Sequence, residues 1–385
     1  MRILVLGAGM YVTGRHGSGS GTILSALCEL SRSGLVSEVC TVSKSRESGV
    51  WVKEAADRIN ALLQTSLPVT HRAIGNGGPD AVESFADGYD AAIISLPDHL
   101  HHSYGIPLLR RGIATLIVKP LTPSLAEAKE LVAAQEAGGA YAAVEFHKRW
   151  DETNLLAKKF FEAGELGQLL YSVVGYSQRI SIPSQTFSSW ASTTNIFQYL
   201  GVHYVDLFYF LTKFAPVRIS AIGTDGILKA NNIDTWDSVH ATIVWRGASQ
   251  KECIQHISCN WIDPDKTTAL SDQKYQLIGT NGRLDIDQKN RGMELVTTEK
   301  GVQAINPYFS EYLPSPDGEI HFQGYGFSSI KQFITDARAI NSGAISVADI
   351  EGKRPTLKES LISTAVIDSA NKSLKEKGEW VTISL

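Results

Sequence analysis

Lys119 is the residue of this chain best placed for chemistry. It follows Leu116-Ile-Val and precedes Pro120, so it is expected to end a buried β-strand. Further along, His203 stands in Gly201-Val-His203, inside an apolar helical pattern. An imidazole, with an ordinary pKa of about 6.5, can accept a hydroxyl proton near neutral pH, and an ammonium can stabilise the alkoxide that forms. The pair predicts proton handling at an alcohol or ketone.

The N-terminus carries the start of a dinucleotide-binding fingerprint. Gly7-Ala-Gly9 follows an apolar run directly, and the missing Cβ atoms let backbone amides approach a pyrophosphate near a helix N-terminus. The third glycine of the fingerprint is absent from its usual place. We expect an insertion that delays the helix until about Thr22, with Gly19 or Gly21 as the close-packing glycine. The alternative is a flexible surface loop.

The end of the second expected strand bears on cofactor choice. An acidic residue there would normally bind the adenine ribose of NAD, but this chain reads Val42-Ser-Lys-Ser-Arg46. Hydroxyls and cations suit a 2′-phosphate, so NADP is favoured over NAD, unless these are solvated loop charges. The expected cofactor contacts are Gly7, Gly9, Met10, Tyr11, Ser43, Lys44, Arg46, Ser95, Leu96, Pro97, His101, Lys119 and Pro120.

Two groups of residues resemble metal sites only superficially. His99, His101 and His102 lie near one another, but no carboxylate or thiolate accompanies them at coordinating spacing. The cysteines are scattered without C-x-x-C spacing, so neither zinc nor a disulfide framework is indicated. We expect no metal.

The elements that position these residues form two patterns. In the first third, short β-branched runs (3–6, 38–42, 91–95, 115–118 and 141–145) alternate with helical patterns (22–33, 50–63, 103–111 and 124–137). This alternation predicts an α/β fold whose N-terminal part is a Rossmann doubly wound parallel sheet, over residues 1–121. Residues 122–385 are expected to form an α+β domain with a large open, mostly antiparallel sheet, whose C-terminal helix can pack back on the first domain.

Within the second domain, helical patterns occur at 151–163, 199–211, 327–338 and 356–373, and strand patterns at 218–223, 238–245, 255–261, 275–279 and 283–286. Thr280-Asn-Gly282 is typical of a hairpin turn. The irregular stretch 306–326 is long enough to be a functional loop.

Composition sets the class of protein. With 385 residues, 43% hydrophobic and 20% charged, the chain can bury a large core. The net charge of −4 and the lack of a basic run argue against a nucleic-acid partner. No apolar run approaches the roughly 20 residues that span a bilayer, and Met1-Arg-Ile-Leu-Val-Leu6 lacks the features of a secretory signal. A cytoplasmic location without membrane contact is expected.

The ordered motifs resemble those of the glucose-fructose oxidoreductase, inositol dehydrogenase and MocA (Gfo/Idh/MocA) family. The motifs are Gly7 and Gly9, 97–101, Val118-Lys119-Pro120, Glu145-Phe-His-Lys-Arg149, Leu166-Gly167 and Gly201-Val-His203. The resemblance implies a Rossmann domain that binds NAD or NADP. It also implies a second domain whose open sheet closes the active site and often forms the interface of a homodimer or homotetramer.

The resemblance also assigns roles, with two departures. Lys119 matches the lysine of a Glu-Lys-Pro signature, with Val118 in place of the glutamate, and would hold the substrate oxygen and the nicotinamide ribose. The family commonly has Asp-x-Gly-x-His where this chain has Tyr199-Leu-Gly-Val-His203. Residues four apart share a helix face, so Tyr199 and His203 keep the spacing. We expect His203 as acid/base, Lys119 as alkoxide stabiliser and Tyr199 as hydrogen-bonding partner or proton relay.

The expected substrate contacts are Lys119, Lys148, Arg149, Trp190, Gln198, His203 and Tyr325. Aromatic faces and multidentate donors suit a sugar or polyol, although Trp190 is equally compatible with core packing. The neighbouring cations Lys148 and Arg149 leave a substrate carboxylate or phosphate open.

These observations favour an NAD(P)-dependent sugar or cyclitol dehydrogenase, or a ketosugar reductase. One alternative is a redox-assisted epimerase or glycosidase that retains its nicotinamide. The other is a non-catalytic sensor of dinucleotide and sugar. Absorbance of the reduced cofactor during turnover distinguishes the first two, and the retained Lys119 and His203 argue against the sensor.

Overall fold

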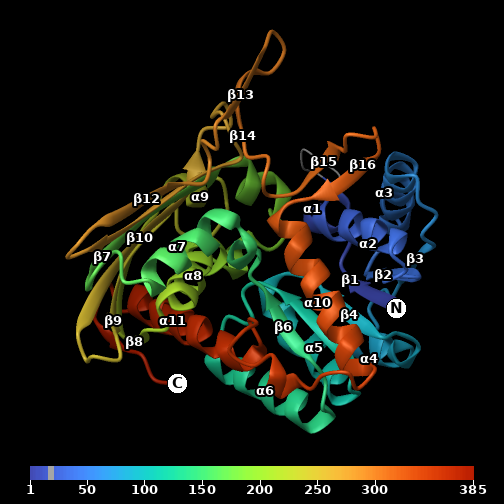
Figure 1. The fold of residues 1–385 in the computed structure, drawn as a ribbon, viewed down its shortest axis with the longest axis horizontal. Helices are drawn as coiled ribbons and strands as arrows, with labels where there is room; N and C mark the ends of the chain where they lie inside the picture. Colours follow the sequence, from blue (N-terminus) through green and yellow to red (C-terminus); the bar gives the residue numbers. More distant parts are fainter. Residues whose placement is uncertain (16–20) are drawn as a thin grey trace. The chain divides into compact units, whose positions relative to one another are not determined.

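The computed structural model describes residues 1–15 and 21–385 and divides into two compact units (Figure 1). The first contains residues 1–122, 126–150 and 308–361, and the second contains 123–125, 151–307 and 362–385. The expected boundary at 121/122 therefore needs correction, since 126–150 and 308–361 lie in the first unit. The reason is nonlocal, because strand 142–145 pairs with strand 114–118 and helix 325–341 packs into the first core.

The first unit is built on a six-stranded parallel sheet of order β3-β2-β1-β4-β5-β6. Its strands are β1 (Arg2–Leu6), β2 (Glu38–Ser43), β3 (Val69–Ala73), β4 (Ala91–Ile94), β5 (Ala114–Val118) and β6 (Ala142–Glu145). Its helices are α1 (Met10–Thr13), α2 (Thr22–Arg32), α3 (Ser48–Leu63), α4 (Gly78–Glu83), α5 (His101–Arg110), α6 (Leu125–Gly138) and α10 (Tyr325–Asn341). The order reverses between β1 and β4, which is the switch point where ligands bind in doubly wound sheets. The predicted Rossmann sheet is confirmed.

Strand β3 was not predicted from the sequence. Its residues Val-Thr-His-Arg-Ala contain no apolar run, and none of them is fully buried. As an edge strand, β3 pairs with β2 and also packs against α3. Its position is therefore set by tertiary context instead of by a local pattern.

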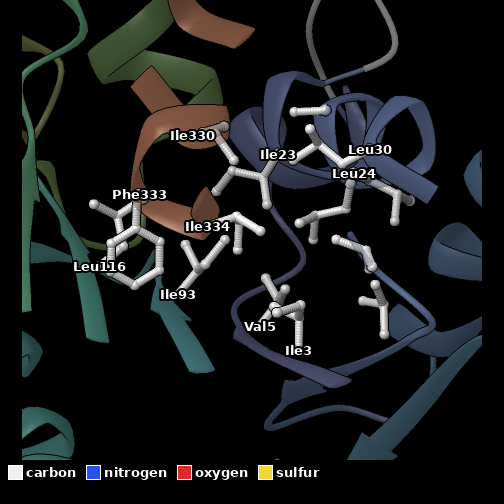
Figure 2. Close-up of a cluster of buried hydrophobic side chains, with 14 of the residues drawn as sticks. Ile3, Val5, Ile23, Leu24, Leu30, Ile93, Leu116, Ile330, Phe333 and Ile334 are labelled. Atoms are coloured by element: carbon white, nitrogen blue, oxygen red, sulfur yellow. The ribbon is translucent and has the colours of Figure 1, made fainter. Parts of the chain in front are cut away.

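The core of the first unit draws on distant parts of the chain. Figure 2 shows side chains from β1, α2 and α10 meeting in one apolar cluster, which includes Ile3, Val5, Ile23, Leu24, Ile330, Phe333 and Ile334. All seven are at most 2% exposed. This burial explains why α10, far along the sequence, belongs to the first unit.

The stretch 306–326 contains a hairpin, β15 (Glu311–Pro314) and β16 (Ile320–Gln323), where the sequence indicated only an irregular loop. The hairpin contacts α2, the long helix that follows the glycine-rich loop. Tyr312 donates a hydrogen bond from Oη to Ser25 Oγ at 2.6 Å, and Arg32 Nη1 donates to the carbonyl of Ile320 at 3.0 Å. The hairpin is therefore hydrogen-bonded to α2 and helps to fix its position.

The second unit is built on a seven-stranded sheet of order β12-β11-β7-β10-β9-β8-β17, in which only β7 and β10 pair in parallel. Its strands are β7 (Leu169–Arg179), β8 (Ala215–Thr224), β9 (Ser238–Arg246), β10 (Glu252–Asp263), β11 (Ser271–Gly279), β12 (Arg283–Asp287) and β17 (Val381–Thr382). Helices α7 (Glu152–Glu162) and α8 (Val202–Thr212) lie along one face of this sheet (Figure 1). The mostly antiparallel second sheet is confirmed.

Two features of this unit escaped prediction. Strand β7 was missed because its exposed face is also apolar, with Leu170, Tyr171 and Val173 each about 40% exposed, so the strand shows no clear alternation. The hairpin β13 (Met293–Thr297) and β14 (Gly301–Ile305) extends away from the sheet (Figure 1). The remaining helices are α9 (Ile227–Ala230) and α11 (Leu357–Lys375), and the boundary between the units falls within α11.

Candidate active site

Gly7 shapes the loop that follows β1. Its φ of +117° is unfavourable for any other residue, and an added Cβ would lie 2.1 Å from the carbonyl oxygen of Ser95. At Gly9, by contrast, an added Cβ would meet no atom of residues 1–15 or 21–385 within 4 Å. The backbone after β1 thus closes onto the end of β4, and none of these residues crowds Gly9, as a cradle for a phosphate group requires.

A short helix intervenes before the predicted one. Gly9 precedes α1, a single turn that carries Met10 and Tyr11, and α2 then begins at Thr22 as expected. An added Cβ on Gly21 would lie 2.5 Å from the carbonyl oxygen of Val12, so Gly21 packs closely against α1. Gly19, the other candidate for close packing, lies outside the described residues.

A hollow of about 310 Å³ opens at the same ends of the parallel strands. Its lining residues are Leu6, Val42, Ser43, Lys44, Ile74, Gly75, Asn76, Gly78, Leu96, Leu100 and Tyr104. This volume is at the lower end of the range for small-molecule sites, and a lysine, two hydroxyls and an amide provide its polar side chains. The residues fit the adenosine half of a dinucleotide.

The hollow contains only some of the predicted cofactor residues. Ser43, Lys44 and Leu96 line it, whereas Arg46 does not. Asn76 and Tyr104 were missed. Asn76 follows β3, the strand that the sequence did not reveal, so its position at the strand ends had no visible signal.

His71 supports the turn that carries Lys44. Its Nδ1 lies 2.8 Å from Thr41 Oγ1, and its Nε2 lies 3.2 Å from the carbonyl oxygen of Ser45. An added Cβ on Gly49 would lie 2.9 Å from the imidazole, so the start of α3 packs against the ring. Burial lowers the pKa of His71. The conformation of this turn therefore depends on β3.

His101 joins two loops. The ring is 1% exposed, with Nδ1 2.8 Å from the carbonyl oxygen of Pro120 and Nε2 2.9 Å from that of Leu96. Burial lowers its pKa, while Asp98 acts in the opposite direction. His101 therefore fixes the loops after β4 and β5 relative to each other and does not line the hollow. Within the part of the chain that the structure describes, no group of three or more histidine, cysteine or acidic side chains is placed to hold a metal.

Lys119 directly follows β5, one residue beyond the strand end where the sequence placed it, and is 8% exposed. Burial lowers its pKa to about 7, because the charged ammonium loses its hydration. The carboxylates of Asp98 and Glu145 oppose this change, and the ammonium of Lys148 adds to it. Lys119 can therefore gain or lose a proton near neutral pH, which an exposed lysine cannot.

A carboxylate that acts on Lys119, and a histidine that lies against this carboxylate, were not predicted as site residues. Glu145, at the end of β6, is 2% exposed, and its Oε2 lies 2.9 Å from Nδ1 of His147. The His147 ring stacks on Tyr325, with centroids 5.7 Å apart, and lies 6.4 Å from the ring of Tyr11. Tyr11 and Tyr325, both predicted site residues, thus both lie near the ring of His147. Because these residues are far apart in the sequence, the cluster could not be predicted from it.

The next two cations lie on the short helix η3 (His147–Trp150). Lys148 is 2% exposed, and its positive charge lowers the pKa of Lys119. Arg149 is 4% exposed, and its Nη1 lies 3.5 Å from Oε1 of Glu359, at the start of α11. Arg149 was predicted to contact substrate, but this buried ion pair supports a structural role.

The remaining candidates belong to the second unit. His203 is in the first turn of α8 and is 3% exposed. Tyr199 lies in the preceding π-helical turn, η6 (Phe197–Gly201), instead of in a continuous α-helix. Such turns change which side chains share a face and are frequent at functional sites. The predicted α-helical spacing of Tyr199 and His203 therefore needs correction.

Trp190 and Gln198 are held by neighbours within this unit. The Trp190 ring lies 4.5 Å from that of Phe187 and 6.0 Å from that of Tyr199. Gln198 is 2% exposed, donates to Thr194 and accepts from Asn371 at 2.8 Å. The amide of Gln198 is thus used inside the fold, whereas Trp190 belongs to an aromatic cluster with Tyr199.

Two family models match this chain, one over its N-terminal part and one over its middle part. Residues 1–146 match the oxidoreductase family with an NAD-binding Rossmann fold (GFO/IDH/MocA), and residues 154–285 match the GFO/IDH/MocA C-terminal domain. Among the described residues, no helix combines the length and apolar character needed to cross a membrane.

Two individual relatives share 24% and 30% sequence identity with this chain, over part of its length. The scyllo-inositol 2-dehydrogenase (NADP(+)) IolW of Bacillus subtilis (strain 168) is 24% identical over 155 residues, which are 40% of this chain and 42% of that protein. The scyllo-inositol 2-dehydrogenase (NAD(+)) of the same strain is 30% identical over 136 residues, 35% of this chain and 39% of that protein. The aligned stretches thus cover less than half of each relative.

The crystal structure of a myo-inositol dehydrogenase from Corynebacterium glutamicum ATCC 13032 aligns with 100% of this chain and 99% of its own, at 17% identity and a TM-score of 0.67. At this identity the match shows a shared fold. The two family matches, which together span more than half of the chain, establish that it belongs to the GFO/IDH/MocA family of NAD-binding oxidoreductases.

Proposed function

We propose that this protein transfers a hydride between a nicotinamide and the carbinol or ketone carbon of a sugar, cyclitol or sugar derivative. The observation that carries the proposal is Lys119, a buried lysine whose pKa is lowered to about 7, at the end of β5. The site after β1 and β4 suits a dinucleotide, and the named relatives act on inositols. The bound nicotinamide would supply the hydride acceptor or donor.

Three side chains of the chain serve the reaction in this proposal. Lys119 in its protonated form binds the substrate oxygen and stabilises the alkoxide as it develops. His203 takes the hydroxyl proton during oxidation and returns it during reduction. Tyr199 hydrogen-bonds the substrate or relays the proton.

We further propose NADP as the preferred cofactor. Ser43 and Lys44 line the hollow at the end of β2, and the lining found among residues 1–15 and 21–385 contains no acidic side chain to bind a ribose 2′-hydroxyl. The B. subtilis relatives use NADP in one case and NAD in the other, so the preference has to come from this chain's own residues. A lysine can form a charge-assisted bond to a 2′-phosphate.

Cofactor titration of Lys44→Ala tests this preference. NADP binding should weaken about ten- to a hundredfold, the loss of one charge-assisted hydrogen bond, while NAD binding stays within about twofold. Arg46→Ala is the matched control, because Arg46 does not line the hollow. Equal losses for NAD and NADP in Lys44→Ala would remove the argument for NADP.

A panel of sugars, uronic acids, inositols and nucleotide sugars with both cofactors tests the reaction itself. Stoichiometric formation of reduced cofactor with one substrate class supports a dehydrogenase. Substrate conversion without net reduction supports the epimerase or glycosidase reaction instead. Dinucleotide and sugar binding without any conversion supports a sensor.

The open face of the second sheet suits a second copy of the chain. Tyr171, Val173 and Ile254 are 38–42% exposed on the neighbouring strands β7 and β10, so apolar side chains gather on this face. We propose a homodimer or homotetramer assembled through this face, acting on a small molecule in the cytoplasm.

A further inference from the structure

We propose that Glu145 is a positioning residue that keeps Lys119 protonated, supplying from β6 the carboxylate that β5 lacks at Val118. This inference rests on the role proposed above for Lys119. It concerns residues of the first unit alone and is argued from strand register, burial and hydrogen bonding.

The register of the sheet brings the two positions together. Strands β5 and β6 pair in parallel, with Val118 directly opposite Glu145. Side chains at paired positions of neighbouring strands point to the same face of a sheet. A carboxylate at 145 therefore stands beside the place that a carboxylate at 118 would occupy. Lys119 directly follows Val118, the last residue of β5, so its backbone lies next to the Val118–Glu145 pair.

Neighbouring side chains hold Glu145 in place. It is 2% exposed, Oε1 accepts a hydrogen bond from Ser329 Oγ on α10, and Oε2 lies 2.9 Å from Nδ1 of His147. These two side-chain partners, which come from different elements, fix the orientation of the Glu145 carboxyl group. A buried carboxylate without such partners would be costly.

The charges around Lys119 come from three further elements. They are Asp98 on the loop after β4, Glu145 on β6 and Lys148 on η3. Asp98 and Glu145 favour the ammonium, Asp98 more strongly, and Lys148 disfavours it. Asp98 Oδ1 accepts from the backbone amide of His99, so Asp98 also stabilises its own loop.

The net effect is a balance near neutrality. Burial and Lys148 remove the proton from Lys119, and the two carboxylates retain it. Without Glu145 the balance should move toward the neutral amine, which cannot stabilise an alkoxide as an ammonium does. Glu145 therefore contributes, together with Asp98, to the pH range over which Lys119 can work.

The titration of Lys119 in the full-length protein tests the inference directly. We would follow its ¹³Cε signal by NMR in lysine-labelled protein without cofactor, with Lys119→Met to assign the signal. Glu145→Gln keeps the shape of the side chain and a hydrogen-bonding oxygen but removes the charge. Its Lys119 pKa should fall by about one unit, because an opposite charge at short range typically contributes one to three.

Two further variants sharpen the test. Adding Val118→Glu to Glu145→Gln returns a carboxylate to the paired position and should restore the titration toward wild type. Glu359→Gln is the matched control, since it removes another buried carboxylate of the same unit, one that pairs with Arg149. Its Lys119 titration should stay as in wild type.

An unchanged Lys119 titration in folded Glu145→Gln, or an equal fall in Glu359→Gln, overturns the inference. Failure of Val118→Glu to restore the titration contradicts the equivalence of the two positions. Should Glu145→Gln not fold, Glu145→Asp is the substitute, because it keeps the carboxylate but moves it back by one methylene group. An unchanged Lys119 titration in that variant also overturns the inference.

Turnover gives a second reading. The upper pH limit of kcat/KM should move down by about one unit in Glu145→Gln, a roughly tenfold loss of kcat/KM above that limit. The NMR titration needs no substrate, so it stands even if no sugar is oxidised. Absence of turnover in the wild type would count against the proposed function. The inference on Glu145 would then still be tested by the NMR titration alone.

Discussion

Replacing Lys119 by methionine should stabilise the protein, and the gain should depend on pH. An unfolded lysine has a pKa of about 10.4, and burial lowers that of Lys119 to about 7. Between these values the unfolded chain binds more protons than the folded one, so wild-type stability rises with pH across this window. Below about pH 7 the folded protein carries a buried ammonium at full cost.

The size of the effect follows from the shift in pKa. One unit corresponds to about 1.4 kcal/mol, so the difference in unfolding free energy between Lys119→Met and wild type is about 4 to 5 kcal/mol near pH 6. Near pH 9 it falls to about 2 kcal/mol, because the folded wild type has already lost its proton. Any other difference between methionine and a neutral lysine adds a constant, so the change with pH is the informative quantity.

Urea unfolding at both pH values, followed by circular dichroism, measures this difference. Lys53→Met is the matched control, because Lys53 lies on α3 with its side chain 76% exposed and should leave the pH dependence unchanged. A difference between Lys119→Met and wild type that stays constant from pH 6 to pH 9 would refute the reasoning. It would mean that Lys119 titrates like an ordinary lysine.

Three other perturbations follow from the structure. Gly7→Ala places a Cβ against the Ser95 carbonyl and should weaken dinucleotide binding at least tenfold, as calorimetry would show; unchanged binding would contradict the cradle. Arg291→Met leaves the buried carboxylate of Asp151 without its guanidinium, 2.7 Å away, and should cost about 3 to 5 kcal/mol in urea unfolding, whereas a loss below about 1 kcal/mol would contradict the importance of this pair. Tyr171→Glu puts a charge into the apolar sheet face and should lower the mass seen by light scattering to that of a smaller assembly; an unaltered mass would place the interface elsewhere.

Local patterns predicted the parts of the site that a single strand and its following loop define. Gly7 and Lys119 could be placed because each directly follows an apolar strand, and parallel strands end at the same edge of a sheet. Helix α2 began at Thr22 as expected, since an amphipathic pattern starts there.

Features that depend on distant pairing could not be predicted. Glu145 became recognisable only through the register between β5 and β6 and through Ser329, which comes from α10. Arg149 looked like a free cation in the sequence because its partner, Glu359, lies far along the chain. No sequence pattern distinguishes the π-helical turn at Tyr199 from an α-helix, because the extra residue per turn changes neither composition nor apolar content.

The central claim is that Lys119 and His203 both serve one hydride transfer. Single-turnover formation of reduced nicotinamide, measured by stopped flow with a substrate identified from the panel, tests it most directly. Lys119→Met and His203→Ala should each slow this step at least about a hundredfold, while binding of the dinucleotide stays within a few fold in His203→Ala. Hydride transfer at near-wild-type rates in both variants would contradict the account.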